Sequence, residues 1–93
     1  MKVRIDPHTL ERAKERGANE EEIKDVLGGG FPIEAKCGRL GRAKVFTFNR
    51  MRSGRFYEQK RVEVIYTIKG DTIVTVTAYV FYGNWGVKDE DLL

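Results

Sequence analysis

A glycine run at positions 28–30 divides the chain into two parts with different hydrophobic periods. Before the run, Ile23, Val26 and Leu27 recur at three- and four-residue spacing, which is the pattern of a helix face. After Pro32, apolar and polar residues alternate, which is the pattern of strands. This order predicts an α+β fold, with two N-terminal helices packed on a twisted, mainly antiparallel sheet of about four strands.

Both predicted helices have sequence signals at their ends. Asp6 can cap the first helix, Pro7 suits its first position, and Gly17 supplies a left-handed stop. Asn19 can cap the second helix, and Glu22 stands three positions later, which completes a capping-box pattern. The expected helices therefore cover residues 7–16 and 20–27.

Turn residues divide the second half of the chain into strands. Residues 38–41 predict a hairpin turn, residues 50–59 a long basic loop, and Gly70-Asp71 a two-residue hairpin turn. The strands expected between them are 33–37, 43–49, 60–69 and 72–82, with a short strand or extended arm at 2–5.

Counting outward from the Gly70-Asp71 turn gives an expected register for the last two strands. Tyr66 would face Thr75, and Val64 would face Thr77. Neither face of this hairpin is purely apolar, so the pattern leaves open which face the helices cover. A β-bulge would shift part of the register.

Positive charge is concentrated in the middle of the chain. Residues 39–61 carry eight Lys and Arg residues against Glu58 alone, whereas residues 1–27 and 62–93 each carry a net negative charge. A concentrated positive field attracts polyanions such as nucleic acids. The alternative is an ordinary basic surface loop and edge strand.

Composition excludes several classes of protein. The single cysteine, Cys37, cannot form an intrachain disulfide, and small secreted domains usually carry several, so a cytoplasmic location is expected. One histidine and one cysteine are too few for a zinc site, and no metal or other cofactor is expected. The chain has no apolar signal segment, and its longest uncharged run, 72–87, is shorter than a membrane helix of roughly 20 apolar residues. Residues 1–93 are expected to form a single domain.

The only histidine lies in a helical row with two arginines. His8, Arg12 and Arg16 are spaced i, i+4, i+8 and so lie along one side of the first helix. Histidine can move the proton of a ribose 2′-hydroxyl while guanidinium groups neutralise the phosphate, which is the chemistry of RNA cleavage. Tyr66 and Thr77 offer hydroxyls on the last hairpin, and the hypothesis is that all five side chains meet in one cleft as catalytic residues.

A structural interpretation of the same row stands beside this one. The arginines would be solvated and paired with Glu11 or Glu15, and His8 would cap or pack against the helix. Tyr66 and Thr77, taken alone, are residues typical of a core or its rim.

Basic and aromatic side chains also occur together from residue 50 onward. Guanidinium groups pair with phosphates and aromatic rings stack on bases, so this mixture is typical of single-stranded nucleic-acid binding. The alternative is that the aromatic residues anchor the loop to the core. The candidate nucleic-acid-binding residues are Arg50, Arg52, Arg55, Tyr57, Lys60, Arg61, Tyr79 and Trp85.

The order of these features resembles a known family. Residues 8–18 resemble a His-x3-Arg-x3-Arg-Gly-Ile opening, and residues 19–27 resemble an acidic second helix that ends in a Val-Leu pair. Residues 60–66 and 77–85 resemble a closing hairpin with a Tyr-Gly-x-Trp ending. These motifs are similar to those of the domain of unknown function 4258 family, which has been placed by comparison with the barnase- and RelE-like toxin nucleases. The departures from the usual pattern are Thr9, Ala13 and Phe81.

The resemblance implies a RelE/barnase-like fold and a metal-independent toxin-type endoribonuclease. His8 would be the acid and base, and Arg12 and Arg16 would hold the phosphate. The implied partners are RNA and an acidic antitoxin protein that covers the basic face. The alternative from another functional class is a non-catalytic module that binds nucleic acid or protein.

Overall fold

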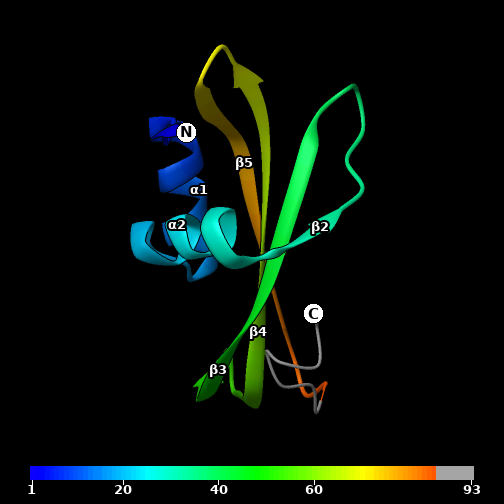
Figure 1. The fold of residues 1–93 in the computed structure, drawn as a ribbon. Helices are drawn as coiled ribbons and strands as arrows, with labels where there is room; N and C mark the ends of the chain where they lie inside the picture. Colours follow the sequence, from blue (N-terminus) through cyan, green and yellow to red (C-terminus); the bar gives the residue numbers. More distant parts are fainter. Residues whose placement is uncertain (86–93) are drawn as a thin grey trace.

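The computed structural model describes residues 1–85. Figure 1 shows two helices beside a strongly twisted sheet, so the α+β class and the two N-terminal helices are confirmed. The elements are β1 (Lys2–Arg4), α1 (Pro7–Arg16), α2 (Glu20–Gly29), β2 (Phe31–Ile33), β3 (Leu40–Arg52), β4 (Arg55–Lys69) and β5 (Thr72–Gly83).

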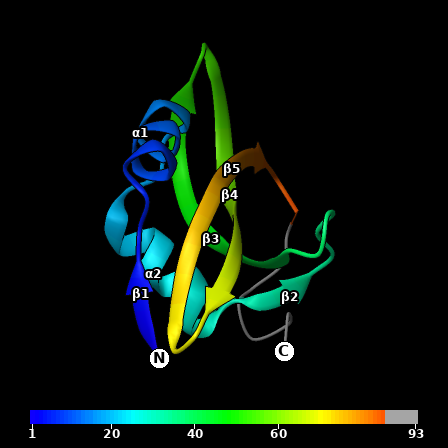
Figure 2. The ribbon, with the colours of Figure 1, turned by 90° about the horizontal axis from the view of Figure 1, so that it is seen from above.

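The sheet has five strands and is mixed, whereas about four mainly antiparallel strands were expected. The strand order is β1-β5-β4-β3-β2, and β1 pairs parallel with β5 while the other neighbours are antiparallel. Val3 lies opposite Ile73 in the parallel pair. The N-terminal arm therefore becomes an edge strand, and Figure 2 shows it beside the start of β5. The expected strand count was too low because a three-residue strand has too short a pattern to assign.

Both helices pack on the same face of the sheet. α1 lies against β5, and α2 lies against β3 and β4. Ile23 and Val26 of α2 meet Val62 and Val64 of β4 in the core, and all four are fully buried. Each such side chain contributes roughly 1.5–3 kcal/mol through burial, which fixes the helix-covered face as the one that carries Val62 and Val64.

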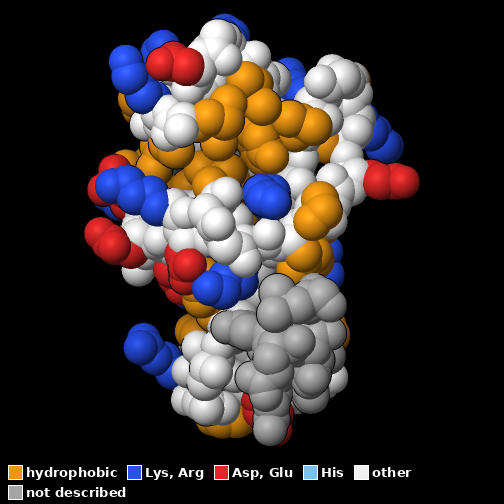
Figure 3. Space-filling view, viewed as in Figure 1, with side chains coloured by type: hydrophobic (Ala, Val, Ile, Leu, Met, Phe, Trp, Pro, Cys, Tyr) orange, Lys and Arg blue, Asp and Glu red, His pale blue; other side chains and the backbone are white. Residues whose placement is uncertain are grey.

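The helices leave one end of the sheet open. Leu40 and Ile68 lie at the end of the sheet where the β4–β5 turn is, and both are nearly half exposed. Figure 3 shows an apolar area at that end, while charged side chains of both signs gather on the helices.

The predicted helix ends are confirmed. The Asp6 carboxylate accepts from the His8 N–H at 2.9 Å. Asn19 and Glu22 form the capping box, with hydrogen bonds of 2.8 and 3.1 Å between each side chain and the other residue's N–H. Gly17 has a φ of 100°, in the left-handed region that favours glycine.

The prediction of a long loop at residues 50–59 is wrong, because this segment forms the end of a long β-hairpin. β3 continues to Arg52, β4 begins at Arg55, and only Ser53 and Gly54 form the turn. Both turn residues have positive φ angles, 52° and 79°, as a tight two-residue hairpin turn requires. We call residues 48–58 the hairpin arm. The sequence of the arm lacks the apolar–polar alternation of a strand, because an arm that lies outside the core needs no apolar face.

The hairpin expected around residues 38–41 also differs from the prediction, because its first strand ends earlier than expected. β2 ends at Ile33, where its partner is Gly41, and residues 34–39 form the connection to β3. Cys37 has a φ of 61° within this connection. The alternation at residues 33–37 therefore extends past the true end of the strand.

The β4–β5 register changes at a bulge. The Gly70-Asp71 turn and the pairing of Tyr66 with Thr75 are confirmed. Beyond them Val64 pairs with Ala78 rather than with Thr77, because β5 carries one extra residue at the irregularity. Ala78 thus takes the helix-covered face, and Thr77 points to the opposite face.

Candidate nucleic-acid groove

A groove of about 500 Å³ lies between the α1–α2 corner and the hairpin arm. Four basic side chains and one carboxylate line it, together with two aromatic rings. We call it the hairpin groove. Its lining residues are Lys14, Gly17, Ala18, Asn19, Glu22, Thr47, Phe48, Arg50, Met51, Arg52, Lys60 and Tyr82.

The C-terminal carbonyl groups of α1 form one wall of the groove, and side chains from the sheet bind them. The Tyr82 hydroxyl donates to the Arg16 carbonyl at 2.7 Å, and the Lys60 ammonium donates to the Gly17 carbonyl at 2.8 Å. Arg52 donates to the Glu15 carbonyl at 3.4 Å. The last carbonyl groups of a helix carry partial negative charge, so cationic donors are favoured there.

Lys60 is held by a second partner as well. Its ammonium lies 2.8 Å from one Glu22 carboxylate oxygen and 2.9 Å from the other, and the residue is only 8% exposed. The same Glu22 closes the capping box of α2. Lys60 therefore ties β4 to the α1–α2 corner and has little capacity left for an external phosphate.

Aromatic rings form the floor of the groove. The centroid of the Tyr82 ring is 5.1 Å from that of Phe48 and 5.7 Å from that of Tyr57. The Arg52 guanidinium lies 4.7 Å from the Tyr82 centroid, and the Arg50 guanidinium lies 5.8 Å from the Phe48 centroid. A guanidinium that stacks on an aromatic ring still presents in-plane N–H groups to another ligand.

The Tyr82 phenol stays neutral well into alkaline solution. Burial raises its pKa, the Arg52 charge lowers it, and the Glu22 charge raises it, so the net direction is upward. A neutral phenol keeps its proton as a hydrogen-bond donor, in agreement with its bond to the Arg16 carbonyl.

Arg50, Arg52 and Lys14 are the basic residues best placed to bind a phosphate. Arg50 and Lys14 are exposed. The 3.4 Å bond from Arg52 to the Glu15 carbonyl is longer than the usual 2.9–3.0 Å, so this guanidinium is weakly held and can exchange its partner.

The predicted catalytic row lies along α1, and only its last member contacts the sheet. His8 and Arg12 are exposed. Arg16 donates to the Ala78 carbonyl at 2.6 Å, and its guanidinium lies 5.2 Å from the Tyr79 ring centroid. About 12 Å of helix axis separates His8 from Arg16 at 1.5 Å per residue. The row is therefore too long to gather at a single phosphate.

The structure does not bring the two predicted hydroxyls to that row in one cleft. Tyr66 is 9% exposed and belongs to the hydrophobic core. Thr77 lies on the opposite face of the sheet, since it pairs with Ile65 beyond the bulge. The expected meeting of all five side chains is thus wrong in its geometry, because Tyr66 is buried in the core and the register shift turns Thr77 to the opposite face.

The predicted nucleic-acid-binding residues divide between the two sides of the sheet. Arg50, Arg52 and Lys60 line the hairpin groove. Tyr57 contacts the Tyr82 ring behind the groove, and Arg55 lies at the tip of the arm. The remaining three predicted residues, Arg61, Tyr79 and Trp85, lie outside the groove lining.

Sequence reasoning missed Lys14, Phe48 and Glu22 as groove residues. Phe48 and Arg50 both line the groove, but the pairing of β3 with β4 is irregular between Thr47 and Arg50, so regular i, i+2 alternation would not have identified them. A bulge at Asn49, with a φ of 48°, lies between them. Lys14 and Glu22 carried no signal because their position depends on how the helices pack.

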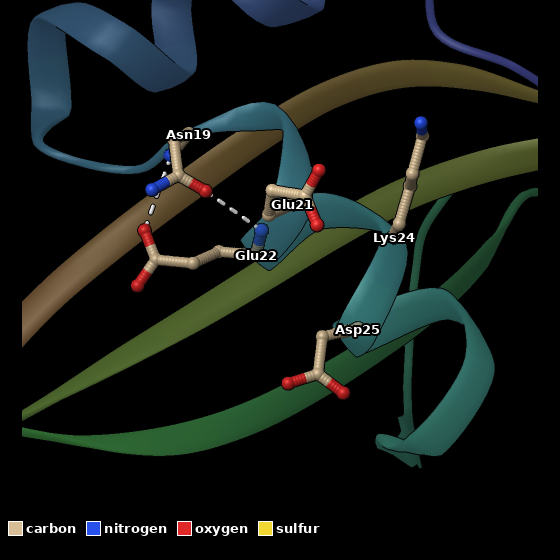
Figure 4. Close-up of a pocket in the computed structure, with 5 residues that line it drawn as sticks. All are labelled: Asn19, Glu21, Glu22, Lys24 and Asp25. Atoms are coloured by element: carbon tan, nitrogen blue, oxygen red, sulfur yellow. Dashed lines mark hydrogen bonds between the residues drawn. The ribbon is translucent and has the colours of Figure 1, made fainter.

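A second hollow lies on the outer side of α2 and has the opposite charge. Figure 4 shows its lining residues: Asn19, Glu21, Glu22, Lys24 and Asp25. Asn19 and Glu22 are occupied in the capping box, and Asp25 pairs with Lys44 at 3.0 Å. The carboxylates of this hollow would repel a phosphate. Within residues 1–85, no group of side chains has the composition of a metal site.

None of the helices within residues 1–85 is long and apolar enough to cross a membrane. Comparisons of the chain with protein families, curated proteins and solved structures found no match. Membership of the domain of unknown function 4258 family, and with it a RelE/barnase-like fold, therefore stays a prediction from the sequence motifs.

Proposed function

We propose that this protein is an RNA-directed domain that binds single-stranded RNA along the hairpin groove. The observation that carries the proposal is the composition of that groove, where Lys14, Arg50 and Arg52 surround the rings of Phe48 and Tyr82. Guanidinium and ammonium groups bind the phosphates of a strand, and aromatic rings bind its bases.

The size of the groove favours a short stretch of single strand. About 500 Å³ is within the range of sites that enclose a small ligand, so the groove can hold part of one strand but not a duplex. The choice of RNA over DNA rests on the resemblance to toxin nucleases.

Catalysis is a separate proposal. A toxin-type endoribonuclease using His8 as acid and base, with Arg12 for phosphate, is supported by the exposure of both side chains. If it is correct, His8→Ala should reduce RNA cleavage by a factor on the order of 10² to 10⁴ without changing RNA affinity. Full cleavage by His8→Ala would show that His8 takes no part in the reaction, and absence of cleavage by the wild type would leave the protein as a binding module.

An acidic antitoxin is the protein partner that the resemblance suggests. The hairpin groove supports this proposal because its three accessible cations would meet carboxylates as readily as phosphates. A bound antitoxin would then exclude RNA from the groove, which a competition assay with the purified pair would detect.

RNA binding through the groove is tested by the salt dependence of affinity. Arg50→Ala and Arg52→Ala should each weaken binding of a short oligouridine and reduce the slope of log affinity against log salt by about 1. Arg39→Ala removes an exposed arginine outside the groove lining and is the matched control. Equal slopes for Arg39→Ala and the two groove variants would contradict the proposal.

A further inference from the structure

Three aromatic rings lie at successive positions on the helix-free face of β5. Tyr79 and Phe81 are two residues apart, so their side chains point to the same face, opposite to the face of Ala78. Their ring centroids are 6.5 Å apart and the rings are inclined by 31°. Tyr79 is 42% exposed and Phe81 is 47% exposed, so both rings are accessible.

The third ring is the indole of Trp85, which fills the place of a side chain on Gly83. A Cβ on Gly83 would lie 2.9–3.1 Å from three atoms of the indole. Gly83 follows Phe81 by two residues, and therefore the indole lies on the same face as Phe81. The backbone N–H of Trp85 donates to the side-chain oxygen of Gln59 at 2.9 Å, which fixes the backbone beside the ring. Trp85 is 42% exposed.

We call Tyr79, Phe81 and Trp85 the aromatic row. Two arginines flank it. Arg61 is the cross-strand partner of Phe81, and its charge is balanced by Glu63 at 2.9 Å. Arg16 reaches the other end of the row from the helix side, with its guanidinium 5.2 Å from the Tyr79 ring centroid.

The aromatic row and the hairpin groove are adjacent across strand β5. Arg16 contributes to both sides of this strand, since its carbonyl accepts from the groove residue Tyr82 while its guanidinium contacts Tyr79. A strand of RNA whose phosphates lie in the groove would therefore have the row within reach around the strand edge.

We propose that the aromatic row is a base-stacking surface for single-stranded RNA, a proposal that rests on RNA binding by the hairpin groove. Every base has a π-face, so stacking on exposed rings binds single strands with little sequence preference. Open sheet faces that carry aromatic side chains bind single-stranded RNA in this way. The row lies beside the groove that would hold the phosphates of the strand, and this position favours RNA over an apolar protein surface as its ligand.

Trp85 makes the proposal directly measurable because it is the only tryptophan of the chain. A short oligouridine should quench its fluorescence in a saturable manner. An oligomer of the same length with ribose and phosphate but no bases should bind through the groove and leave the fluorescence unchanged.

Substitution of Phe81 separates stacking from apolar contact. Phe81→Leu keeps an apolar side chain on the strand but removes the aromatic face, and it should lower oligouridine affinity by a factor on the order of ten. The salt dependence should stay as in the wild type, because no phosphate contact is lost. Phe56→Leu makes the same change at an exposed phenylalanine on the hairpin arm and should have no effect.

The outcomes distinguish the two proposals. Binding that keeps its dependence on Arg50 but is unaffected by Phe81→Leu, with equal fluorescence for both oligomers, overturns the stacking surface alone. No binding of oligouridine at low salt overturns the groove and the row together. A change of sedimentation on Phe81→Leu, with RNA affinity unchanged, would assign the row to contact between copies of the protein instead.

Discussion

The hydroxyl of Tyr82 donates a 2.7 Å hydrogen bond to the carbonyl of Arg16 and so joins the end of α1 to the last strand. The contact depends on the residue that follows Arg16. A Cβ on Gly17 would overlap the Tyr82 hydroxyl oxygen and lie 2.9 Å from a guanidinium nitrogen of Arg52. Gly17 therefore serves both the left-handed end of the helix and the approach of the phenol.

Gly17→Ala should destabilise the protein by more than its backbone conformation explains. The left-handed conformation alone costs an alanine about 1–2 kcal/mol, and displacement of Tyr82 adds to this. Gly38→Ala is the matched control, since Gly38 has a φ of 69° but open space around it. Urea unfolding should show a larger loss for Gly17→Ala, and equal losses would mean that Tyr82 moves aside without cost.

The pH dependence of stability should report on the same phenol. Because the pKa of Tyr82 is raised in the folded state, the folded protein holds the phenol proton more tightly than the unfolded chain. Its contribution is fully present below the ordinary tyrosine pKa of about 10 and is lost as the pH rises through the higher folded-state value. Thermal unfolding between neutral and strongly alkaline pH should therefore show a steeper loss for the wild type than for Tyr82→Phe. Parallel curves would contradict this.

Local patterns determined which parts of the structure the sequence could predict. The helix ends follow from Asp6, Gly17 and the Asn19–Glu22 pair, all of which act within a few residues. The register of β5 could not be predicted in the same way. The bulge at residue 76 allows Ala78 to pack under α1, and no local sequence pattern marks it.

The candidate site shows the same division between local and long-range information. The sequence identified Arg50 and Arg52 as candidate binding residues from their positive charge, and both residues line the groove. The predicted cleft around His8 was not formed, since it required Thr77 to lie on the helix-covered face. Helix packing, rather than residue type, also decided that Lys60 would be buried against Glu22.

Thr9 is a buried residue whose hydroxyl finds no hydrogen-bond partner within residues 1–85. The side chain is fully buried on the sheet side of α1. Thr9→Val keeps the volume and removes the unpaired hydroxyl, and the two residues have similar helix propensities. The variant should be more stable by about 1 kcal/mol, measured by urea unfolding. Destabilisation by Thr9→Val would indicate that the hydroxyl is hydrogen-bonded in solution.

Lys60→Met should strongly destabilise the protein because it leaves Glu22 without its ion-pair partner in a largely buried position. Removing one member of a buried pair costs about 3–5 kcal/mol. The Lys44–Asp25 pair has a similar N–O distance of 3.0 Å but more exposed side chains. Lys44→Met is therefore the control and should cost less than about 1 kcal/mol. Similar losses for the two variants in urea unfolding would show that Glu22 is rehydrated when Lys60 is removed.

Arg12 and Arg16 should differ in what they do, although the sequence places them in one row. Arg16 donates a 2.6 Å bond to the Ala78 carbonyl, and no strand pairs with the outer edge of β5 within the described residues at that point. A hydrogen bond from a charged donor contributes about 1.5–3 kcal/mol, so Arg16→Ala should lower the melting temperature clearly. Arg12 is exposed, and Arg12→Ala should change the melting temperature little.

The same two variants discriminate between the structural and the catalytic interpretation of the row. If Arg12 holds the phosphate in an endoribonuclease, Arg12→Ala should reduce cleavage of RNA while stability is unchanged. Arg16→Lys provides the necessary comparison, because it keeps the charge but not the planar group that contacts both the Ala78 carbonyl and the Tyr79 ring. Loss of stability in Arg16→Lys with full activity of Arg12→Ala would show that Arg16 strengthens the edge of the sheet and that Arg12 takes no part in cleavage.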